Sequence, residues 1–213
     1  MSEKRIAFLH TAAVHEPTFG GLMACLAPEI ALTHLNDESL LADAMAGQEV
    51  TARLEDRLKE LAAAKPDLIV CSCSTLGGPA ETAGKALGLP VLRIDRAMAE
   101  QAVAGGGRIL VAACIESTIA PTLALLRDVA ESPPDLETLV IAGAWDKFLA
   151  GDLAGYHETI AAGLRQAAPG ASAVVLAQAS MAPAAALCKD LAVPILSSPE
   201  IGVRRAIDLV TAG

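Results

Sequence analysis

Short apolar runs alternate along the chain with longer segments whose apolar residues recur at helical spacing. The clearest helical pattern covers residues 49–64, where Val50, Leu54, Leu58 and Leu61 fall on one face. Most of the apolar runs lack alternation, which is typical of parallel strands buried on both faces. The pattern predicts an α/β fold with parallel sheets and right-handed crossovers. The predicted strands are 5–11, 30–36, 67–73, 91–94, 108–114, 137–142, 172–178 and 193–197.

This order of segments occurs twice. The stretch KRIAFLHT near the start resembles GRILVAAC, and Pro90 and Pro194 open equivalent strands in the two halves. The same comparison pairs Cys73 with Ser180. The repeat predicts two similar, doubly wound parallel-sheet lobes of four β-α units each, related by pseudo-twofold symmetry.

The stretch AGGGR has the composition of a linker between these lobes. It places the boundary between an N-terminal lobe, residues 1–104, and a C-terminal lobe, residues 105–213. In parallel α/β sheets, ligands bind at the carboxyl ends of the strands. The active site is therefore expected in the cleft where the strand ends of both lobes meet.

Composition excludes several classes of function. Of the 213 residues, 53% are hydrophobic and 2% are aromatic, and the net charge is −9. The chain is thus expected to fold, and an acidic surface with few aromatic rings argues against nucleic-acid binding. Prolines interrupt the longest uncharged run, Gln166 to Cys188, and the start of the chain lacks an export signal. These features predict a cytoplasmic protein without a membrane segment.

The five cysteines are too widely spaced, and odd in number, for a disulfide framework. Cys73 comes where a predicted strand gives way to a helix, and Ser74, Thr75 and two glycines follow it. Free backbone N–H groups at such a helix start attract a carboxylate and lower the pKa of a thiol. Cys73 is therefore a candidate acid/base or nucleophile, whereas Cys71, further back in the strand, is expected to pack in the core.

Metal and nucleotide cofactors find little support. A zinc site needs three or four ligands, and only His10 and His15 could join the two cysteines of Cys71-Ser72-Cys73. The chain has neither a GxGxxG nor a Walker motif, so no NAD, FAD or ATP site is predicted. Ser180 lacks the GxSxG surroundings of a hydrolase nucleophile. No cofactor and no metal are expected.

Other polar residues lie at the predicted strand ends. His10 and Thr11 end the first strand, where Thr11 could hydrogen-bond a carboxylate and His10 is either a ligand contact or a satisfied core histidine. Thr118 follows the equivalent strand of the second half and could bind a ligand, cap a helix, or do both. His34 and His157 are expected to be structural.

The two α/β halves, the CST motif after the third strand and the matching position in the second half resemble the aspartate/glutamate/hydantoin racemase superfamily. That superfamily also contains maleate isomerase and arylmalonate decarboxylase. The resemblance implies cofactor-independent chemistry, in which a cysteine from each lobe flanks the carbon that is deprotonated. Carried over, Cys73 is the first cysteine, and Ser74 and Thr75 bind the substrate carboxylate.

The second cysteine position of the family falls on Ser180, followed by Met181, which is expected to contact the substrate. A serine hydroxyl is a far weaker acid than a thiol, so symmetric two-cysteine racemisation is not expected. The leading hypothesis is a racemase or isomerase of a small carboxylate, with Cys73 as acid/base or nucleophile and Ser180 as the opposing polar group. The alternatives are a decarboxylase on the same scaffold and a non-catalytic ligand-binding protein. Apolar helices would also permit a homo-oligomer.

Overall fold

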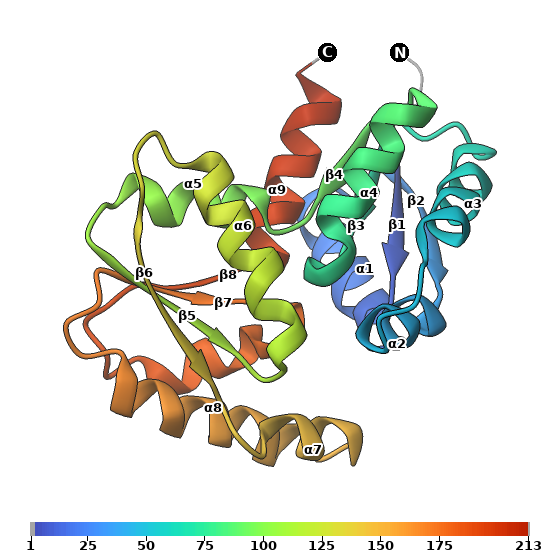
Figure 1. Cartoon of the computed structure of the whole chain (residues 1–213). Helices are drawn as coiled ribbons and strands as arrows, with labels where there is room; N and C mark the ends of the chain where they lie inside the picture. The colour runs from blue at the N-terminus through green and yellow to red at the C-terminus, as the bar shows by residue number, and fades with distance from the viewer. Residues whose placement is uncertain (1–2, 213) are drawn as a thin grey trace. The chain divides into compact units, whose positions relative to one another are not determined.

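The structure is a computed structural model that describes residues 3–212 (Figure 1). The chain divides into two compact units. One contains the residues up to Asp95 together with those from Pro199 onward, and the other is Arg96–Ser198. Each unit has its own four-stranded parallel sheet flanked by helices, which confirms the predicted α/β class with two similar lobes.

The first unit has the strand order β2-β1-β3-β4. Central strands β1 and β3 are almost entirely buried, whereas edge strand β2 is partly exposed. The elements in chain order are β1 (Arg5–His10), α1 (His15–Leu26), β2 (Ala31–Asn36), α2 (Glu38–Met45), α3 (Thr51–Ala62), β3 (Leu68–Cys71), α4 (Ser74–Leu87), β4 (Val91–Arg93) and, after the second unit, α9 (Ser198–Thr211).

Alternating side chains of the central strands bury two different faces of this sheet. Leu9 and Ile69 pack with Leu54 of α3 and Leu76 of α4 in one core cluster. Phe8 points to the other face and stacks on Phe19 of α1. Cys73 is the N-cap residue of α4 and Gly88 its C-cap residue; the φ of 68° at Gly88 is a backbone conformation that favours glycine.

The second unit repeats this plan with the strand order β6-β5-β7-β8. Its central strands β5 and β7 are buried, and edge strand β6 is half exposed. The elements in chain order are α5 (Arg96–Ala104), β5 (Arg108–Ala113), the 3-10 helix η1 (Glu116–Thr118), α6 (Ile119–Val129), β6 (Asp135–Val140), α7 (Ala144–Leu149), α8 (Leu153–Ala167), β7 (Ala173–Leu176), the 3-10 helix η2 (Ala179–Cys188) and β8 (Ile195–Ser197).

One face of the second sheet packs against α8 and η2. Tyr156, Ile160 and Leu164 of α8 share a core cluster with Leu110 and with Met181 of η2. Figure 1 shows α7 and α8 running along one side of β5 and β7, with α5 and α6 on the other side. Hydrophobic burial on both faces explains why the central strands are uniformly apolar.

The eight predicted strands are all present, each within two residues of its expected limits. The boundary predicted from the repeat lies between residues 104 and 105. The compact units of the structure have different boundaries. Helix α5 belongs to the second unit although it lies before that boundary, and the residues of α9 from Pro199 onward belong to the first. In the first unit, Gly202 of α9 lies against the backbone of Ile94, where any Cβ would clash.

Within residues 3–212, no helix has both the length and the apolar character that a membrane span requires.

Candidate active site

Cys73 lies at the carboxyl end of the first sheet, two residues after β3, and is the N-cap residue of α4. Its backbone is extended, with φ −97° and ψ 117°, and its side chain is 6% exposed. The Thr11 hydroxyl hydrogen-bonds the thiol, and the backbone N–H groups of Thr75 and Leu76 interact with the sulfur. The structure thus brings together Cys73 and Thr11, two of the predicted site residues.

Burial nevertheless raises the pKa of the Cys73 thiol above its ordinary value, because desolvation outweighs the hydrogen bonds from Thr11 and the helix start. The N–H groups of the helix start do act to lower this pKa, as expected, but burial outweighs them and the net shift is upward. The pKa of the Cys71 thiol is raised even further, again chiefly by burial. Cys71 is fully buried in the core cluster, as expected for a packing residue.

A buried ion pair contacts the first turn of α4, which follows Cys73. Arg93 and Asp95 are 5% and 1% exposed, and the guanidinium donates to both carboxylate oxygens of Asp95, at 2.7 and 2.9 Å. Arg93 Nη2 also donates to the carbonyl oxygen of Ser74, at 3.3 Å. Arg93 thus connects β4 to the first turn of α4, directly after Cys73.

Gly77 is required by this packing. A Cβ at residue 77 would lie 2.9 Å from Cβ of Arg93, a separation that real Cβ atoms essentially never show. The absence of a side chain at Gly77 therefore lets α4 approach Arg93 closely. Ser74 is 7% exposed, and Thr75 is half-buried.

His10 points to the opposite face of the sheet from Cys73. Ser72 Oγ donates to the carbonyl oxygen of Leu9, at 3.2 Å, and lies 2.8 Å from His10 Nδ1. Nδ1 is therefore the protonated nitrogen, and Nε2 accepts from His34 Nδ1 at 2.9 Å. His10 is fully buried and stacks on Phe8 and Phe19. Both ring nitrogens are occupied, which favours the core-histidine alternative over a ligand contact.

Acidification should destabilise the fold through this histidine. Burial, helped by the neighbouring His34 and His15, lowers the pKa of His10 from 6.5 to about 3. The unfolded chain binds a proton below pH 6.5 and the folded chain does not, so stability is lost as the pH falls from 6.5 toward 3. At pH 5 the loss due to His10 is about 2 kcal/mol. Urea unfolding at neutral pH and at pH 5 should show it, and His10→Asn should flatten the difference. An equally steep pH dependence in His10→Asn would contradict this assignment.

The second sheet shows which residue is equivalent to Cys73. Leu9 of β1 pairs with Cys71, and Ala112 of β5 pairs with Leu176. Counting two residues onward leads to Cys73 in the first unit and to Gln178 in the second. Gln178 is also the N-cap residue of η2, with an extended backbone, as Cys73 is of α4. The counterpart of Cys73 is therefore Gln178. The pairing with Ser180 is wrong, because the comparison of apolar runs was shifted by two residues; in the strand register Ser180 is equivalent to Thr75.

Ser180 lies in a hydrogen-bonded cluster of the second unit. Its Oγ is 2.9 Å from the hydroxyl oxygen of Tyr156, and its carbonyl oxygen is 3.1 Å from His157 Nε2. The Tyr156 hydroxyl is also hydrogen-bonded to Cys114, which directly follows β5. Met181 is fully buried in the core cluster. Its expected substrate contact is corrected to a packing role.

Cys114 occupies the position in the second unit that Thr11 occupies in the first, since each follows the equivalent strand. It is 6% exposed, like Cys73, and its N–H donates to Gln178 Oε1 at 2.6 Å. Burial raises the pKa of its thiol to about 11, and the hydrogen bond from Tyr156 acts against that rise. The second unit therefore also presents a thiol at the carboxyl end of its sheet.

Unpartnered buried hydroxyls lie at the same end of the second sheet. Thr118 and Ser198 are 2% and 1% exposed, and within residues 3–212 no hydrogen-bond partner reaches Thr118 Oγ1 or Ser198 Oγ. Thr118 follows β5, and Ser198 follows β8. An unsatisfied buried hydroxyl costs about 1–3 kcal/mol, so such groups call for an explanation. Thr118 does not cap α6 through its side chain, which leaves its hydroxyl available to a ligand oxygen.

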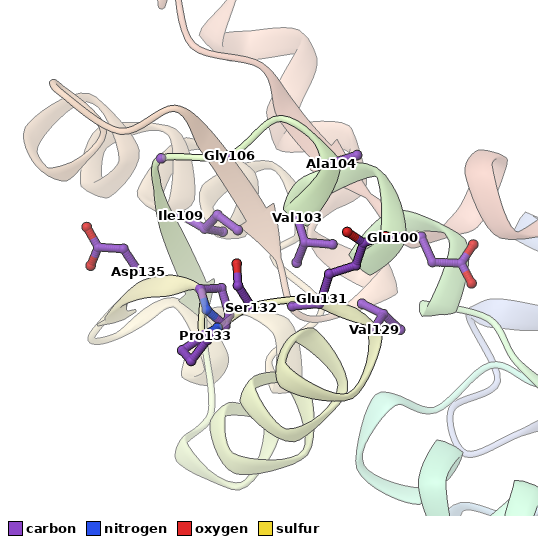
Figure 2. Close-up of a pocket in the computed structure, with 13 residues that line it drawn as sticks. Glu100, Val103, Ala104, Gly106, Ile109, Val129, Glu131, Ser132, Pro133 and Asp135 are labelled. Atoms are coloured by element: carbon purple, nitrogen blue, oxygen red, sulfur yellow. The ribbon is translucent and has the colours of Figure 1, made fainter.

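A pocket of about 590 Å³ lies elsewhere in the second unit (Figure 2). It is lined by Glu100 and Val103 of α5, by Ile109 near the start of β5, and by the loop that leads to Asp135. This is the amino end of the sheet. Its lining includes neither Cys114 nor Ser180, which lie at the carboxyl end, so this pocket does not belong to the candidate site.

The fold has two similar α/β lobes, and each parallel sheet carries a buried thiol at its carboxyl end, Cys73 in the first and Cys114 in the second. The family model described as Asp/Glu/Hydantoin racemase matches residues 22–206. The chain belongs to this family. Comparison with curated protein sequences returned no match.

Solved structures of racemases share the fold. Glutamate racemase isoform RacE1 from Bacillus anthracis is 15% identical, with 100% of this chain and 83% of that chain covered and a TM-score of 0.74. A putative Asp/Glu racemase from Yersinia pestis is 17% identical, with coverages of 98% and 99% and a TM-score of 0.73. Arylmalonate decarboxylase is 18% identical, with coverages of 98% and 93% and a TM-score of 0.61. At these identities the similarity shows the fold.

The sequence analysis missed Arg93, Asp95, Cys114 and Tyr156. Two signals were present. First, the match of KRIAFLHT with GRILVAAC aligns Thr11 with Cys114. Second, Arg93 is a charged residue within a predicted buried strand, and Asp95 is one directly after it. Burying such charges is costly unless they are paired, which itself predicts an ion pair. Tyr156 had no comparable signal, because its helix brings it to the strand ends only in the folded protein.

Proposed function

We propose that the protein is a cofactor-independent racemase or isomerase of a small carboxylate, in which Cys73 is the thiol acid/base or nucleophile. The observation that carries this proposal is the position of Cys73. It is the N-cap residue of α4 at the carboxyl end of a parallel sheet, and its thiol interacts with the Thr11 hydroxyl and the backbone N–H groups of the helix start. Membership of the Asp/Glu/Hydantoin racemase family supports the same chemistry.

The substrate class follows from the hydrogen-bond donors at the carboxyl end of the first sheet. A carboxylate accepts hydrogen bonds from hydroxyl and backbone N–H groups, and the segment after Cys73 offers both kinds. The first turn of α4 provides N–H groups and the Ser74 and Thr75 hydroxyls. The second unit, taken by itself, has the buried hydroxyls of Thr118 and Ser198, which lack protein partners among residues 3–212. Fixed donors that stabilise developing negative charge usually make the largest contribution to catalysis.

The raised pKa of Cys73 sets a condition on the reaction. A neutral thiol is poised to donate a proton to a carbanion, whereas removal of a proton from carbon requires the thiolate. Formation of the thiolate must therefore accompany substrate binding, or occur at alkaline pH. The same thiolate could instead add to a carbon–carbon double bond, as an isomerase of an unsaturated diacid would require.

A decarboxylase is the second candidate, because Gln178 rather than a cysteine is the counterpart of Cys73. Loss of carbon dioxide leaves a carbanion that one thiol can protonate, so a second cysteine at the equivalent strand end is not needed. Arylmalonate decarboxylase has a similar fold. A lyase would release carbon dioxide from a substituted malonate.

The test is a proton NMR screen in deuterium oxide with amino acids, hydantoins, maleate and substituted malonates. Exchange of the α-proton for deuterium without loss of carbon supports the racemase or isomerase. Release of carbon dioxide assigns the chain to the decarboxylases. Tight binding without exchange, isomerisation or carbon loss would favour a non-catalytic binding protein and contradict the proposal.

A further inference from the structure

We propose that the buried hydrogen bond between His10 and Ser72 positions the reactive thiol of the first unit. Through the ends of β1 and β3, this bond holds the Thr11 hydroxyl against the Cys73 sulfur. His10 and Ser72 are thus positioning residues, which act on the thiol through Thr11. The inference rests on the proposed function, because that function makes Cys73 the reacting group.

Two side-chain pairs join β1 and β3 at consecutive positions. Continued one residue past its last pair, the parallel register of these strands sets His10 beside Ser72. One residue further, it sets Thr11 beside Cys73. Successive side chains of a strand point to opposite faces, so the two pairs lie on opposite sides of the sheet. Both pairs are hydrogen-bonded. A shift of either strand end would therefore disturb both bonds together.

The hydrogen bonds around His10 form a chain with one direction. Ser72 Oγ donates its proton to the carbonyl oxygen of Leu9, so it accepts from His10 Nδ1 at 2.8 Å. His10 Nε2 accepts in turn from His34 Nδ1, at 2.9 Å. His10 and Ser72 are 0% and 1% exposed, so water does not compete for these bonds. With both ring nitrogens engaged, the imidazole has one orientation.

This chain requires a neutral His10, and the surroundings keep it neutral. Burial, helped by His34 of β2 and His15 of α1, lowers the pKa of His10 from 6.5 to about 3. Burial also lowers the pKa of His34, although nearby Glu16 of α1 acts in the opposite direction. Both imidazoles are therefore uncharged at neutral pH. A proton on His10 Nε2 would face the Nδ1–H of His34 and break the chain.

The place of the Thr11 hydroxyl matters for the charge on Cys73. Burial raises the pKa of the Cys73 thiol, and the hydrogen bond from Thr11 is the largest of the effects that lower it. Thr11 directly follows His10, whose carbonyl oxygen accepts from the backbone N–H of Asp37 at 3.0 Å. The end of β1 is thus held by both the side chain and the carbonyl group of His10. Loss of the bond to Ser72 should therefore lower the thiolate fraction of Cys73.

The first test measures the thiol without any substrate. Iodoacetamide alkylates thiolates, and peptide mass spectrometry compares Cys73 with the exposed Cys25 of the same sample. Thr11→Val removes the hydroxyl and should slow the alkylation of Cys73 about tenfold at mildly alkaline pH, the effect of one hydrogen bond to a charged group. Ser72→Ala should slow it about threefold, because the bond from Thr11 is then only partly lost. Alkylation of Cys25 should not change.

Two variants of His10 separate hydrogen bonding from packing. His10→Asn places an amide group near the position of Nδ1 and can still donate to Ser72, so Cys73 should react at about the parental rate. His10→Phe keeps the stacking on Phe8 and Phe19 but removes the donor, and should slow the reaction as Ser72→Ala does. A purely packing role for His10 predicts the reverse order, because phenylalanine fills the space of the ring better than asparagine.

A double variant shows whether the effect passes through Thr11. If it does, Ser72→Ala should slow the alkylation of Cys73 in the parent and not in the Thr11→Val background, where the positioned hydroxyl is already gone. Equal slowing in both backgrounds would overturn the positioning role. The same holds if His10→Phe, folded by circular dichroism, reacts at the parental rate.

Turnover separates this inference from the proposed function. On whichever compound of the screen the parent turns over, Ser72→Ala should lower kcat and leave KM nearly unchanged, because its side chain lies on the opposite face from Cys73. If turnover needs Cys73 but Ser72→Ala keeps the parental kcat, the positioning role falls and the proposed function stands. If the alkylation pattern is as expected but the parent turns over no compound, the positioning of the thiol stands and the proposed function falls.

Discussion

Cys73→Ala should lower the rate of deuterium exchange by about 100-fold to 10,000-fold, the usual contribution of a positioned acid/base group. The rate is measured on whichever compound of the screen the parent turns over. The thiol is the only group of residue 73 that can carry the proton or attack carbon, and alanine removes it without adding bulk. The side chain is small and already buried, so the variant should remain folded.

Cys71→Ala is the matched control for this experiment. It removes a second buried thiol only two residues away, from a position that packs in the core of the first unit. The control should lose some stability and keep its turnover. Equal activity of Cys73→Ala and the parent would exclude Cys73 from the chemistry, and equal losses in both variants would point to a general disturbance of the β3–α4 segment.

Asp95→Asn should lower the free energy of unfolding by about 3–5 kcal/mol, because it leaves the Arg93 guanidinium buried without its countercharge. The pair is well placed for such a loss. Both side chains are almost inaccessible, and both carboxylate oxygens accept from Arg93. Urea unfolding at neutral pH measures the change. Because Arg93 also holds the Ser74 carbonyl, the turnover of the folded variant should fall as well.

Two further variants show whether the cost comes from the unpaired charge. Asp190→Asn breaks a pair of similar two-oxygen geometry with Arg165, but both partners are exposed, so stability should hardly change. Combining Asp95→Asn with Arg93→Met removes both charges and should recover part of the lost stability. A single variant as stable as the parent would show that the buried pair contributes nothing to the fold.

Much of this architecture could be predicted from the sequence, because buried positions in helices and strands are apolar and recur in regular patterns. All eight strands were predicted within two residues. The signal is clearest for the central strands β1, β3, β5 and β7, which are apolar because both of their faces are buried. The repeat was visible for the same reason. Cys73 was predictable because a cysteine followed by Ser, Thr and two Gly residues occurs where a strand gives way to a helix.

The parts that escaped prediction depend on the folded structure. The register of β7 relative to β5 decides that Gln178, and not Ser180, is the counterpart of Cys73, and a comparison of apolar runs does not resolve a shift of two residues. The direction of the Cys73 pKa depends on how completely the thiol is desolvated, which only packing determines. The link from Tyr156 to Cys114 joins a helix to a strand end more than forty residues away in the sequence.

The assignment of α9, from Pro199 onward, to the first unit affects the order in which the two units can fold during synthesis. The residues up to Asp95 reach their last helix only after Ser198, so the second unit is an insertion within the first. Arg96–Ser198 is continuous and can complete its core while the chain is still being synthesised. The first unit must wait for the final residues before α9 covers Ile94. Removing Arg96–Ser198 should therefore preserve the first unit better than dividing the chain at the repeat boundary between residues 104 and 105. Division at that boundary would separate the first sheet from α9, the helix that completes its core.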